Sequence, residues 1–319
     1  MLKKIEEPLV SILINNYNYG RFLQSAVESS LNQTYRNIEI IIVDDGSTDK
    51  SREILEAYSA VRNIKVILKS NGGQASAFNA GFENSSGDII CFLDADDIFH
   101  YSKVDSIVDS FANGNNTIGW LFHYLDLFEN KFELSSQYSD VAPQSSFEEV
   151  KFYDLQDNIK KGKLNGYIPL DLNIATSGLC YKRQLLKKIL PMPENIRITS
   201  DDYLKYASMG TSPGLISSKK LAYQRIHSDN AYTLRPNSSY LKAKTQVITA
   251  FFLLKFFPEL KNFSNNLLSM GIYLFWCEKK MDKAYKELVQ EYFSSIEFYE
   301  RFLIYTKAAY YRCLYFLSK

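Results

Sequence analysis

Residues 89–97 read IICFLDADD, an apolar run that passes directly into an acidic cluster. The apolar part has the length and composition of a buried strand. Asp94, Asp96 and Asp97 follow where that strand would end. Mg²⁺ and Mn²⁺ prefer carboxylate oxygens and are often held by one or two of them plus substrate phosphates. Such a cluster alone more often forms an acidic turn or a helix N-cap. Its place directly after a strong strand favours the metal site.

The first hundred residues alternate between strand and helix patterns. Strands are predicted at residues 9–14, 38–43, 64–68 and 89–93, and helices at 22–31, 51–58 and 74–83. Apolar strands separated by helices indicate a parallel sheet with helices on both faces. Ligands of such sheets bind beyond the carboxyl ends of the strands. Polar clusters follow three of these strands, at residues 15–17, 44–47 and 94–97, so we expect the clusters to share one edge of the sheet.

The composition is that of an ordinary globular protein. Of 319 residues, 46% are hydrophobic and 23% charged, which allows a large core. The net charge of +1 favours neither nucleic acid nor an acidic partner. Four scattered cysteines form no metal or disulfide pattern, so a reducing cytoplasm fits best. The N-terminus lacks a signal-peptide pattern. No uncharged apolar run reaches the roughly 18 residues that span a bilayer, so we expect no membrane crossing.

Several motifs in order give the chain a specific resemblance. They are residues 10–18 (VSILINNYN), 30–35 (SLNQTY), 42–49 (IVDDGSTD), 71–81 (NGGQASAFNAG) and 92–97 (FLDADD). Together they resemble the opening of the family 2 glycosyltransferases of the GT-A fold, with Phe78 where an Arg is usual. The resemblance implies an α/β fold of Rossmann-like GT-A type, with a mostly parallel sheet flanked by helices. It also implies an inverting, metal-assisted glycosyltransferase that uses a nucleotide diphosphate sugar.

The same resemblance assigns the metal. It makes FLDADD the DxD motif, with Asp96 as the expected metal ligand and Asp97 close by. His227, in a late segment that resembles family residues near the diphosphate or metal, is a further candidate, although a buried structural role is its default. Mn²⁺ or Mg²⁺ is the expected ion. A Lewis-acid cation can neutralise the charge that gathers on the departing diphosphate.

Donor contacts are expected at the same edge. The candidates are Asn15, Tyr17, Asp44, Asp45, Asp94 and Arg225, and the expected carrier is UDP. Asp45 is expected to bind the nucleobase, while Asp94 binds either metal or ribose. The ring of Tyr17 either stacks on the base or packs in the core. Arg225 is either a phosphate contact or a surface ion pair. Residues 44–49 are also typical of a strand-to-helix connection with a capping Ser, Thr or Asp.

The catalytic base is expected in residues 199–204 (TSDDYL), which resemble the family segment that holds it. Spacing to Leu204 aligns Asp201 with the base and leaves Ser200 where the family often has Glu. Asp202 is the competing candidate. Without the resemblance, both carboxylates would be read as the first turn of a helix, where the helix dipole favours negative charge.

The last part of the chain is predicted to be helical. We expect a boundary near Pro236, between a catalytic domain at residues 1–236 and a helical region at 237–319. Residues 301–319 combine aromatic and basic side chains and hold no acidic residue. Such a helix either lies in a membrane interface or packs on the catalytic domain or on a second subunit. The first reading suits an enzyme of polysaccharide biosynthesis that acts on a glycan or lipid-linked glycan at the inner face of the membrane.

Two other functions remain open at this stage. One is a nucleotide-sugar-binding regulatory or scaffold protein without turnover, which the acidic residues at both expected sites argue against. The other is a sugar nucleotidyltransferase, which usually has a glycine-rich loop with Arg and Lys after the first strand. Residues 15–21 (NNYNYGR) match that loop poorly, and the chain has no GxxxxGK[ST] phosphate loop.

Overall fold

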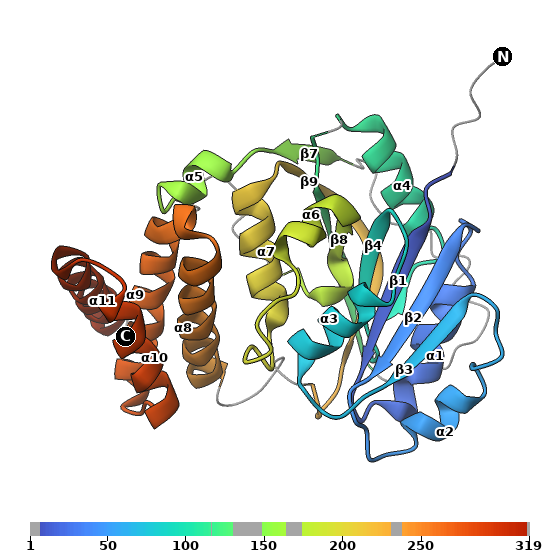
Figure 1. Ribbon diagram of the computed structural model, residues 1–319, viewed down its shortest axis with the longest axis horizontal. Coiled ribbons are helices and arrows are strands. Elements are labelled where there is room, and N and C mark those ends of the chain that lie inside the picture. The colour runs from blue at the N-terminus through green and yellow to red at the C-terminus, as the bar shows by residue number, and fades with distance from the viewer. Residues whose placement is uncertain (1–6, 116, 130–148, 164–173, 231–237, 318–319) are drawn as a thin grey trace. The chain divides into compact units, whose positions relative to one another are not determined.

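The computed structural model describes residues 7–115, 117–129, 149–163, 174–230 and 238–317 (Figure 1). The chain divides into two compact units. Unit 1 comprises residues 1–154, 171–197 and 212–227, and unit 2 comprises residues 155–170, 198–211 and 228–319. The boundary expected near Pro236 lies outside the described residues.

Unit 1 is built on one mixed sheet. Its strands are β1 (Val10–Asn16), β2 (Ile38–Asp44), β3 (Ile64–Leu68), β4 (Ile89–Asp94), β5 (Ile98–Phe99), β6 (Trp120–Glu129), β7 (Val150–Tyr153), β8 (Leu179–Lys182) and β9 (Gly214–Ile226). They run in the order β3-β2-β1-β4-β8-β6-β9-β5, and β7 pairs with β9. The first four strands are parallel, as predicted, and β8 lies antiparallel between β4 and β6.

Helices cover both faces of this sheet. The helical segments of unit 1 are α1 (Gly20–Leu31), α2 (Ser51–Glu56), α3 (Gln74–Glu83), α4 (Lys103–Asn113), α6 (Arg183–Ile189) and the 3₁₀ helix η2 (Thr176–Gly178). Alternate strand residues such as Ile12 join the core that α1, α2 and α4 bury. The next residue along, Leu13, faces α3, where it lies against Gly81. Strands buried on both faces read as continuous apolar runs, which explains the strand patterns of the sequence.

The register of the parallel strands fixes the functional edge. Asn15 on β1 lies opposite Asp94 on β4, and Asn16 lies opposite Asp44 on β2. The three polar clusters therefore meet at the carboxyl ends of adjacent strands, as the sequence predicts. Because side chains alternate between faces, Asn15 and Asp94 lie on the α3 side of the sheet, whereas Asn16 and Asp44 lie on the other side.

Unit 2 is helical in its described residues. Its elements are α5 (Gln156–Lys160), α7 (Ser200–Thr211), α8 (Ser238–Phe256), the 3₁₀ helix η3 (Pro258–Leu260), α9 (Lys261–Glu278), α10 (Lys283–Ser294) and α11 (Phe298–Leu317). The close pair α8 and α9 needs Gly271, because a Cβ there would lie 2.7 Å from Val247 Cγ2. Among the described residues, none of the helices has the length and apolar character needed to cross a membrane.

Candidate functional site

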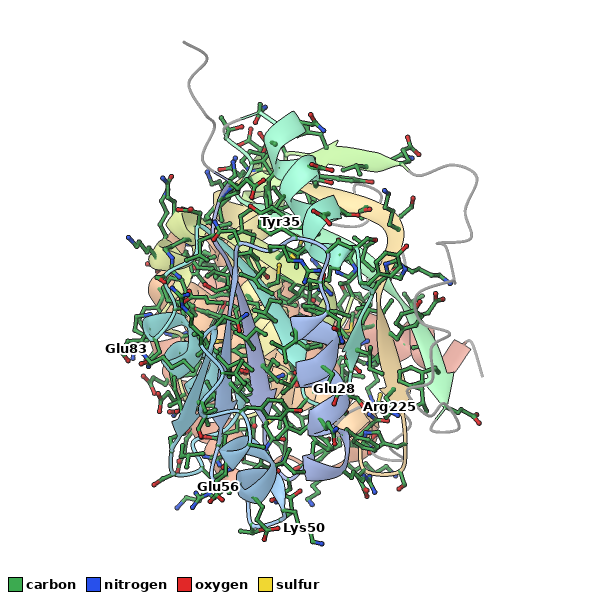
Figure 2. All side chains as sticks on the ribbon, turned by 90° about the vertical axis from the view of Figure 1, so that its right-hand side faces the viewer. Glu28, Tyr35, Lys50, Glu56, Glu83 and Arg225 are labelled. Atoms are coloured by element: carbon green, nitrogen blue, oxygen red, sulfur yellow. The ribbon has the colours of Figure 1, made fainter. Side chains whose placement is uncertain are left out.

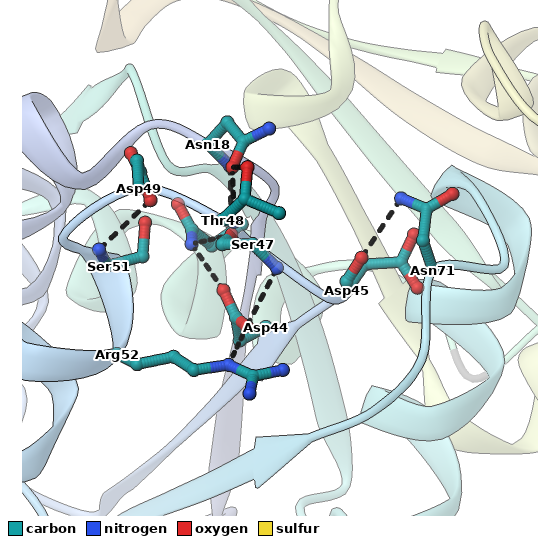
Figure 3. Close-up of polar contacts among 10 residues, drawn as sticks. Asn18, Asp44, Asp45, Ser47, Thr48, Asp49, Ser51, Arg52 and Asn71 are labelled. Carbon is teal, nitrogen blue, oxygen red and sulfur yellow. Dashed lines mark hydrogen bonds and ion pairs between the residues drawn. The ribbon is translucent and has the colours of Figure 1, made fainter.

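Asp44 organises the loop that follows β2 (Figure 3). Asn16 Nδ2 donates to Asp44 Oδ1 at 2.8 Å, and the Ser47 amide donates to Asp44 Oδ2 at 3.1 Å. Arg52 Nε lies 3.5 Å from the same Oδ2. The carboxylate is buried and is used by protein donors. Asp44 therefore orders the loop at this edge of the sheet, and its direct contact with a nucleotide sugar stays a prediction.

Asp45 organises the neighbouring loop before α3. Its Oδ1 accepts hydrogen bonds from Lys69 Nζ at 2.7 Å and from the Gly72 amide at 2.9 Å, and its Oδ2 accepts from the Gly73 amide at 2.7 Å. Gly73 has a φ of 90°, and a Cβ there would lie 2.8 Å from Arg197 Cα. Only glycine fits this position without strain. Asp45 thus fixes the start of α3, and nucleobase binding by Asp45 stays a prediction.

Asn15 has both of its side-chain polar atoms unsatisfied at this edge, where Asn16 Oδ1 is unsatisfied as well. The residue is only 9% exposed, yet in the part of the chain that the structure describes neither its amide nitrogen nor its amide oxygen has a hydrogen-bond partner. Leaving a buried polar group unpaired costs about 1–3 kcal/mol. Tyr17, two residues further on, is 47% exposed, so its ring is not packed in the core. An unpaired amide beside Asp94 and an accessible ring are the features expected where a polar ligand binds.

Asp96 forms a close pair with His227. Asp96 Oδ2 lies 3.0 Å from His227 Nε2, and the two side chains are 10% and 5% exposed. Nδ1 of the same ring lies 3.5 Å from an Arg21 nitrogen. A neutral imidazole protonated on Nε2 donates to Asp96 and accepts from Arg21, which satisfies both contacts. The ring also packs on Tyr19 and Phe22, with centroids 5.5 and 4.7 Å away.

Arg225 holds the backbone of this acidic loop. Its Nε donates to the Asp96 carbonyl at 3.0 Å. Its guanidinium lies 4.6 Å from the ring centroids of Phe22 and Phe128. Figure 2 shows Arg225, a residue of β9, beside α1 on the face of the sheet that this helix covers. Arg225 is 5% exposed, so of the two sequence-based readings a surface ion pair is wrong, and phosphate contact stays a prediction.

Asp97 is the structural member of the acidic cluster. Ser177 Oγ donates to Asp97 Oδ2 at 2.6 Å, and the Arg225 amide donates to Oδ1 at 3.0 Å. The same Ser177 oxygen accepts from the Asp94 amide at 3.1 Å. Burial, and then the charges of Asp96 and Asp94, hold the pKa of Asp97 well above its ordinary value. Asp97 thereby ties β4, η2 and β9 together, and metal ligation by Asp97 stays a prediction.

The side chains of Asp96 and His227 could serve as ligands of a divalent cation that is also held by substrate oxygens. Within the described ranges, no group of three or more His, Cys, Asp or Glu side chains converges closely enough to form a complete metal site. Asp96 and His227 offer one carboxylate and one imidazole, with Asp94 two residues away. A partial protein ligand set is the usual arrangement for Mg²⁺, which keeps its remaining positions for water and substrate phosphates.

Asp201 and Asp202 lie in the first turn of α7, in unit 2. Lys205 Nζ lies 3.1 Å from Asp201 Oδ2 and 3.0 Å from Asp202 Oδ1, so one cation bridges both carboxylates. Burial raises the pKa of Asp201, and the charge of Lys205 opposes that effect. Burial acts to lower the pKa of Lys205, but the two carboxylates outweigh it and hold that pKa above its ordinary value.

Sequence reasoning missed three residues that support these groups. Lys69 follows a predicted strand directly, but nothing in the sequence shows that it reaches back to Asp45. Ser177 lies 80 residues from Asp97 in the sequence, and nothing in the sequence shows that the two side chains meet. Lys205 could have been found, because it stands four residues after Asp201 in a predicted helix, where side chains of opposite charge meet.

Comparison with known proteins identifies the family and the fold of the chain. Residues 11–170 match the model of glycosyl transferase family 2. An uncharacterised glycosyltransferase of Nostoc sp. is 36% identical over 241 residues, which cover 74% of this chain and 71% of that protein. The solved structure of S. aureus TarS in complex with UDP-GlcNAc is similar with a TM-score of 0.56 at 18% identity, over 84% of this chain and 73% of that one. A Pyrobaculum calidifontis mannosyltransferase in complex with GDP-Man and Mn²⁺ is similar with a TM-score of 0.50 at 14% identity, over 97% and 88% of the two chains.

Proposed function

Because this chain belongs to glycosyl transferase family 2, we propose that it moves a sugar, with inversion, from a nucleoside diphosphate to an acceptor hydroxyl. The observation that carries the proposal is the unpaired, buried amide of Asn15 at the strand edge that also holds Asp94 and Asp96. A buried polar group without a partner destabilises the free protein, and a ligand that supplies the missing hydrogen bonds offsets that cost.

The nucleotide is proposed to bind at the carboxyl ends of β1, β2 and β4. Asn15 offers one hydrogen-bond donor and one acceptor, which complements the adjacent N–H and carbonyl of a uracil edge. The accessible ring of Tyr17 offers a face for the base, and Asp45 and Asp94 complete the contacts to base and ribose. The similarity to TarS, which was solved with UDP-GlcNAc, supports UDP as the carrier.

The diphosphate end of the donor is proposed to lie at Asp96 and His227, which would hold Mn²⁺ or Mg²⁺ with it. When bound, the cation supplies positive charge for the departing diphosphate. The chain's own contribution is to fix this loop. Arg225 holds the Asp96 carbonyl, and Asp97 holds Ser177 and the Arg225 amide. The guanidinium charge of Arg225 also favours phosphate in the same neighbourhood.

Asp201 is proposed as the general base, with Asp202 as the alternative. The acceptor O–H gives its proton to the carboxylate while its oxygen attacks the anomeric carbon. The bond from that carbon to the phosphate oxygen breaks on the opposite side, and the nucleoside diphosphate leaves with the electron pair. A positioned carboxylate typically contributes about 10²–10⁴-fold to the rate of such a step. We further propose a glycan or lipid-linked glycan as acceptor, with the reaction on the cytoplasmic side in polysaccharide biosynthesis.

A panel of nucleotide sugars tests this function directly. We expect one UDP-sugar to raise the melting temperature in the presence of Mn²⁺, because a ligand at a hundredfold excess over its Kd stabilises by about 2.7 kcal/mol. The stabilising donor should then give UDP release with an acceptor panel. Stabilisation without turnover on any acceptor would identify a binding protein instead. Pyrophosphate release from a nucleoside triphosphate and a sugar phosphate would identify a nucleotidyltransferase.

Replacing Asn15 by leucine should have opposite effects on stability and on donor binding. We expect the melting temperature of the free protein to rise by about 2–4 °C, because the unpaired buried amide is removed. Donor affinity should fall roughly tenfold, because the ligand loses its amide contacts. Asn79→Leu is the matched control, since Asn79 donates to and accepts from the Met192 backbone at 2.8 Å, and its loss should lower stability. Unchanged donor affinity in Asn15→Leu would remove Asn15 from the site.

A further inference from the structure

The outer face of α11 is apolar and exposed. Two adjacent lines of residues form it, one of Phe298, Phe302, Ala309 and Cys313, and the other of Tyr299, Leu303, Tyr310 and Leu314, and the exposed Thr306 is the polar residue between them. Phe298, Tyr299, Phe302 and Tyr310 are each more than half exposed. At 3.6 residues per turn these lines cover roughly half of the helix circumference, and none of their side chains is charged. The opposite side, with Ile304 and Ala308, is buried against α9, beside which α11 lies in Figure 1.

The charges of α11 lie along the margins of this face. Arg301 and Arg312 follow one margin and Lys307 follows the other. Glu300 is the only acidic residue of the helix. Its side chain is 14% exposed and pairs with Lys261 of α9 at 2.9 Å, so it adds no negative charge to the outer face. The surface therefore presents aromatic rings bordered by positive charge.

The neighbouring helix shows that this is not the general character of unit 2. α10 exposes Lys283, Lys286, Glu287, Gln290 and Glu291, a mixed charged surface typical of a helix in water. At the edge of the α11 face, Tyr305 stacks on Trp276 of α9, with centroids 6.1 Å apart and planes 7° from parallel. The aromatic surface thus continues onto the helix beneath it.

We propose that the outer face of α11 docks on the interface of an anionic lipid membrane. A helix with aromatic residues on one face and bases at its margins can lie in the plane of the interface, with its rings among the acyl chains and its bases at the headgroups. Tyrosine suits this depth because its ring is apolar and its hydroxyl remains hydrated. The inference goes beyond the proposed transfer and does not depend on it.

A second copy of this chain is the less suitable occupant. If two α11 faces met about a twofold axis, the same surface of both copies would be in contact. The marginal bases of one copy would then face the marginal bases of the other, and like charges across an interface are unfavourable. Anionic headgroups instead place negative charge near these margins, where Arg312 is exposed, while Arg301 and Lys307 are half-buried and donate to the Ile296 carbonyl and to Asn266 Oδ1.

Flotation of the full chain with vesicles tests the proposal without donor or acceptor. We expect binding to vesicles of phosphatidylglycerol and phosphatidylcholine in equal parts, and much weaker binding to phosphatidylcholine alone. The double variant Phe302→Ser, Tyr310→Ser should bind the anionic vesicles at least about tenfold more weakly, because both substitutions remove large apolar rings from the contact. Phe256→Ser is the matched control, since Phe256 is 53% exposed at the end of α8, and it should bind like the unaltered chain.

A second measurement separates docking from nonspecific adsorption. Lipids brominated in their acyl chains should quench Trp276, next to the α11 face, more strongly than Trp120, which is fully buried in unit 1. The proposal is overturned if the unaltered chain fails to bind anionic vesicles, or if the double variant binds as tightly. A dimer in lipid-free solution that the double variant converts to monomer, together with no vesicle binding, would assign the face to self-association instead.

Discussion

Replacing Asp96 by alanine should reduce sugar transfer by at least about a hundredfold and remove the dependence of donor binding on Mn²⁺. Loss of a partner that merely supports a metal ligand typically costs about 10–100-fold in affinity or activity, so loss of a ligand should cost at least as much. The measurements are transfer rate and donor-induced thermal shift, each with Mn²⁺ and with a chelator. In the unaltered protein the chelator should abolish both, whereas in the variant it should change neither.

The fold should survive this substitution. Arg225 donates to the Asp96 backbone carbonyl, which alanine retains. The lost carboxylate is one of the charges that raise the pKa of buried Asp97, so its removal relieves a repulsion. Alanine also leaves the buried Nε2 of His227 without its carboxylate partner, which opposes that gain, so the melting temperature without ligands should change by only a few degrees. Asp109→Ala, at an exposed position on α4, is the matched control and should transfer normally. If Asp96→Ala keeps a Mn²⁺-dependent donor shift, the metal is held elsewhere.

The first half of the sheet could be predicted because its signals are local. β3 and α3 have the bounds expected from sequence, Ile64–Leu68 and Gln74–Glu83. Strands buried on both faces leave no ambiguity about their apolar runs. β9 (Gly214–Ile226) has no continuous apolar run of this kind, because SSKK interrupts it at residues 217–220. Its first half pairs with β6 on one side and with β7 on the other, so its identity depends on partners distant in sequence.

The candidate site divides in the same way. The meeting of residues 15–17, 44–47 and 94–97 follows from a general rule about strand ends in parallel sheets. The hydrogen bonds that hold those residues in place do not follow from any such rule. Asp97 meets Ser177 and the Arg225 amide across 80 and 128 residues of sequence. The sequence also does not show which polar side chains are already hydrogen-bonded within the protein, as Asp45 is, and which lack a partner, as Asn15 does.

Asp201→Asn should abolish transfer while leaving donor binding intact. The amide cannot accept a proton, and loss of a general base typically costs about 10²–10⁴-fold. Asp201 is favoured over Asp202 on a physical ground as well as on its place in the motif. Its side chain is 17% exposed against 32% for Asp202, and burial raises the pKa of Asp201, which makes it a stronger base than an ordinary aspartate. Donor-induced thermal shift and acceptor-dependent UDP release measure the two properties separately. Normal transfer by Asp201→Asn with loss in Asp202→Asn would move the base by one residue.

Variants of Lys205 test whether Asp201 accepts the proton, because they should shift the pH dependence of kcat only if it does. The general base must be deprotonated, so transfer falls as pH drops through its pKa in the enzyme–substrate complex. The charge of Lys205 lowers the pKa of Asp201 against the effect of burial. Lys205→Met removes that charge and leaves the burial, so the pKa should rise and the acid limb of the kcat profile should move to higher pH. Lys205→Arg keeps the charge and should leave the limb near its original position. If all three proteins share one acid limb while Lys205→Met still folds, Asp201 is not the group that accepts the proton.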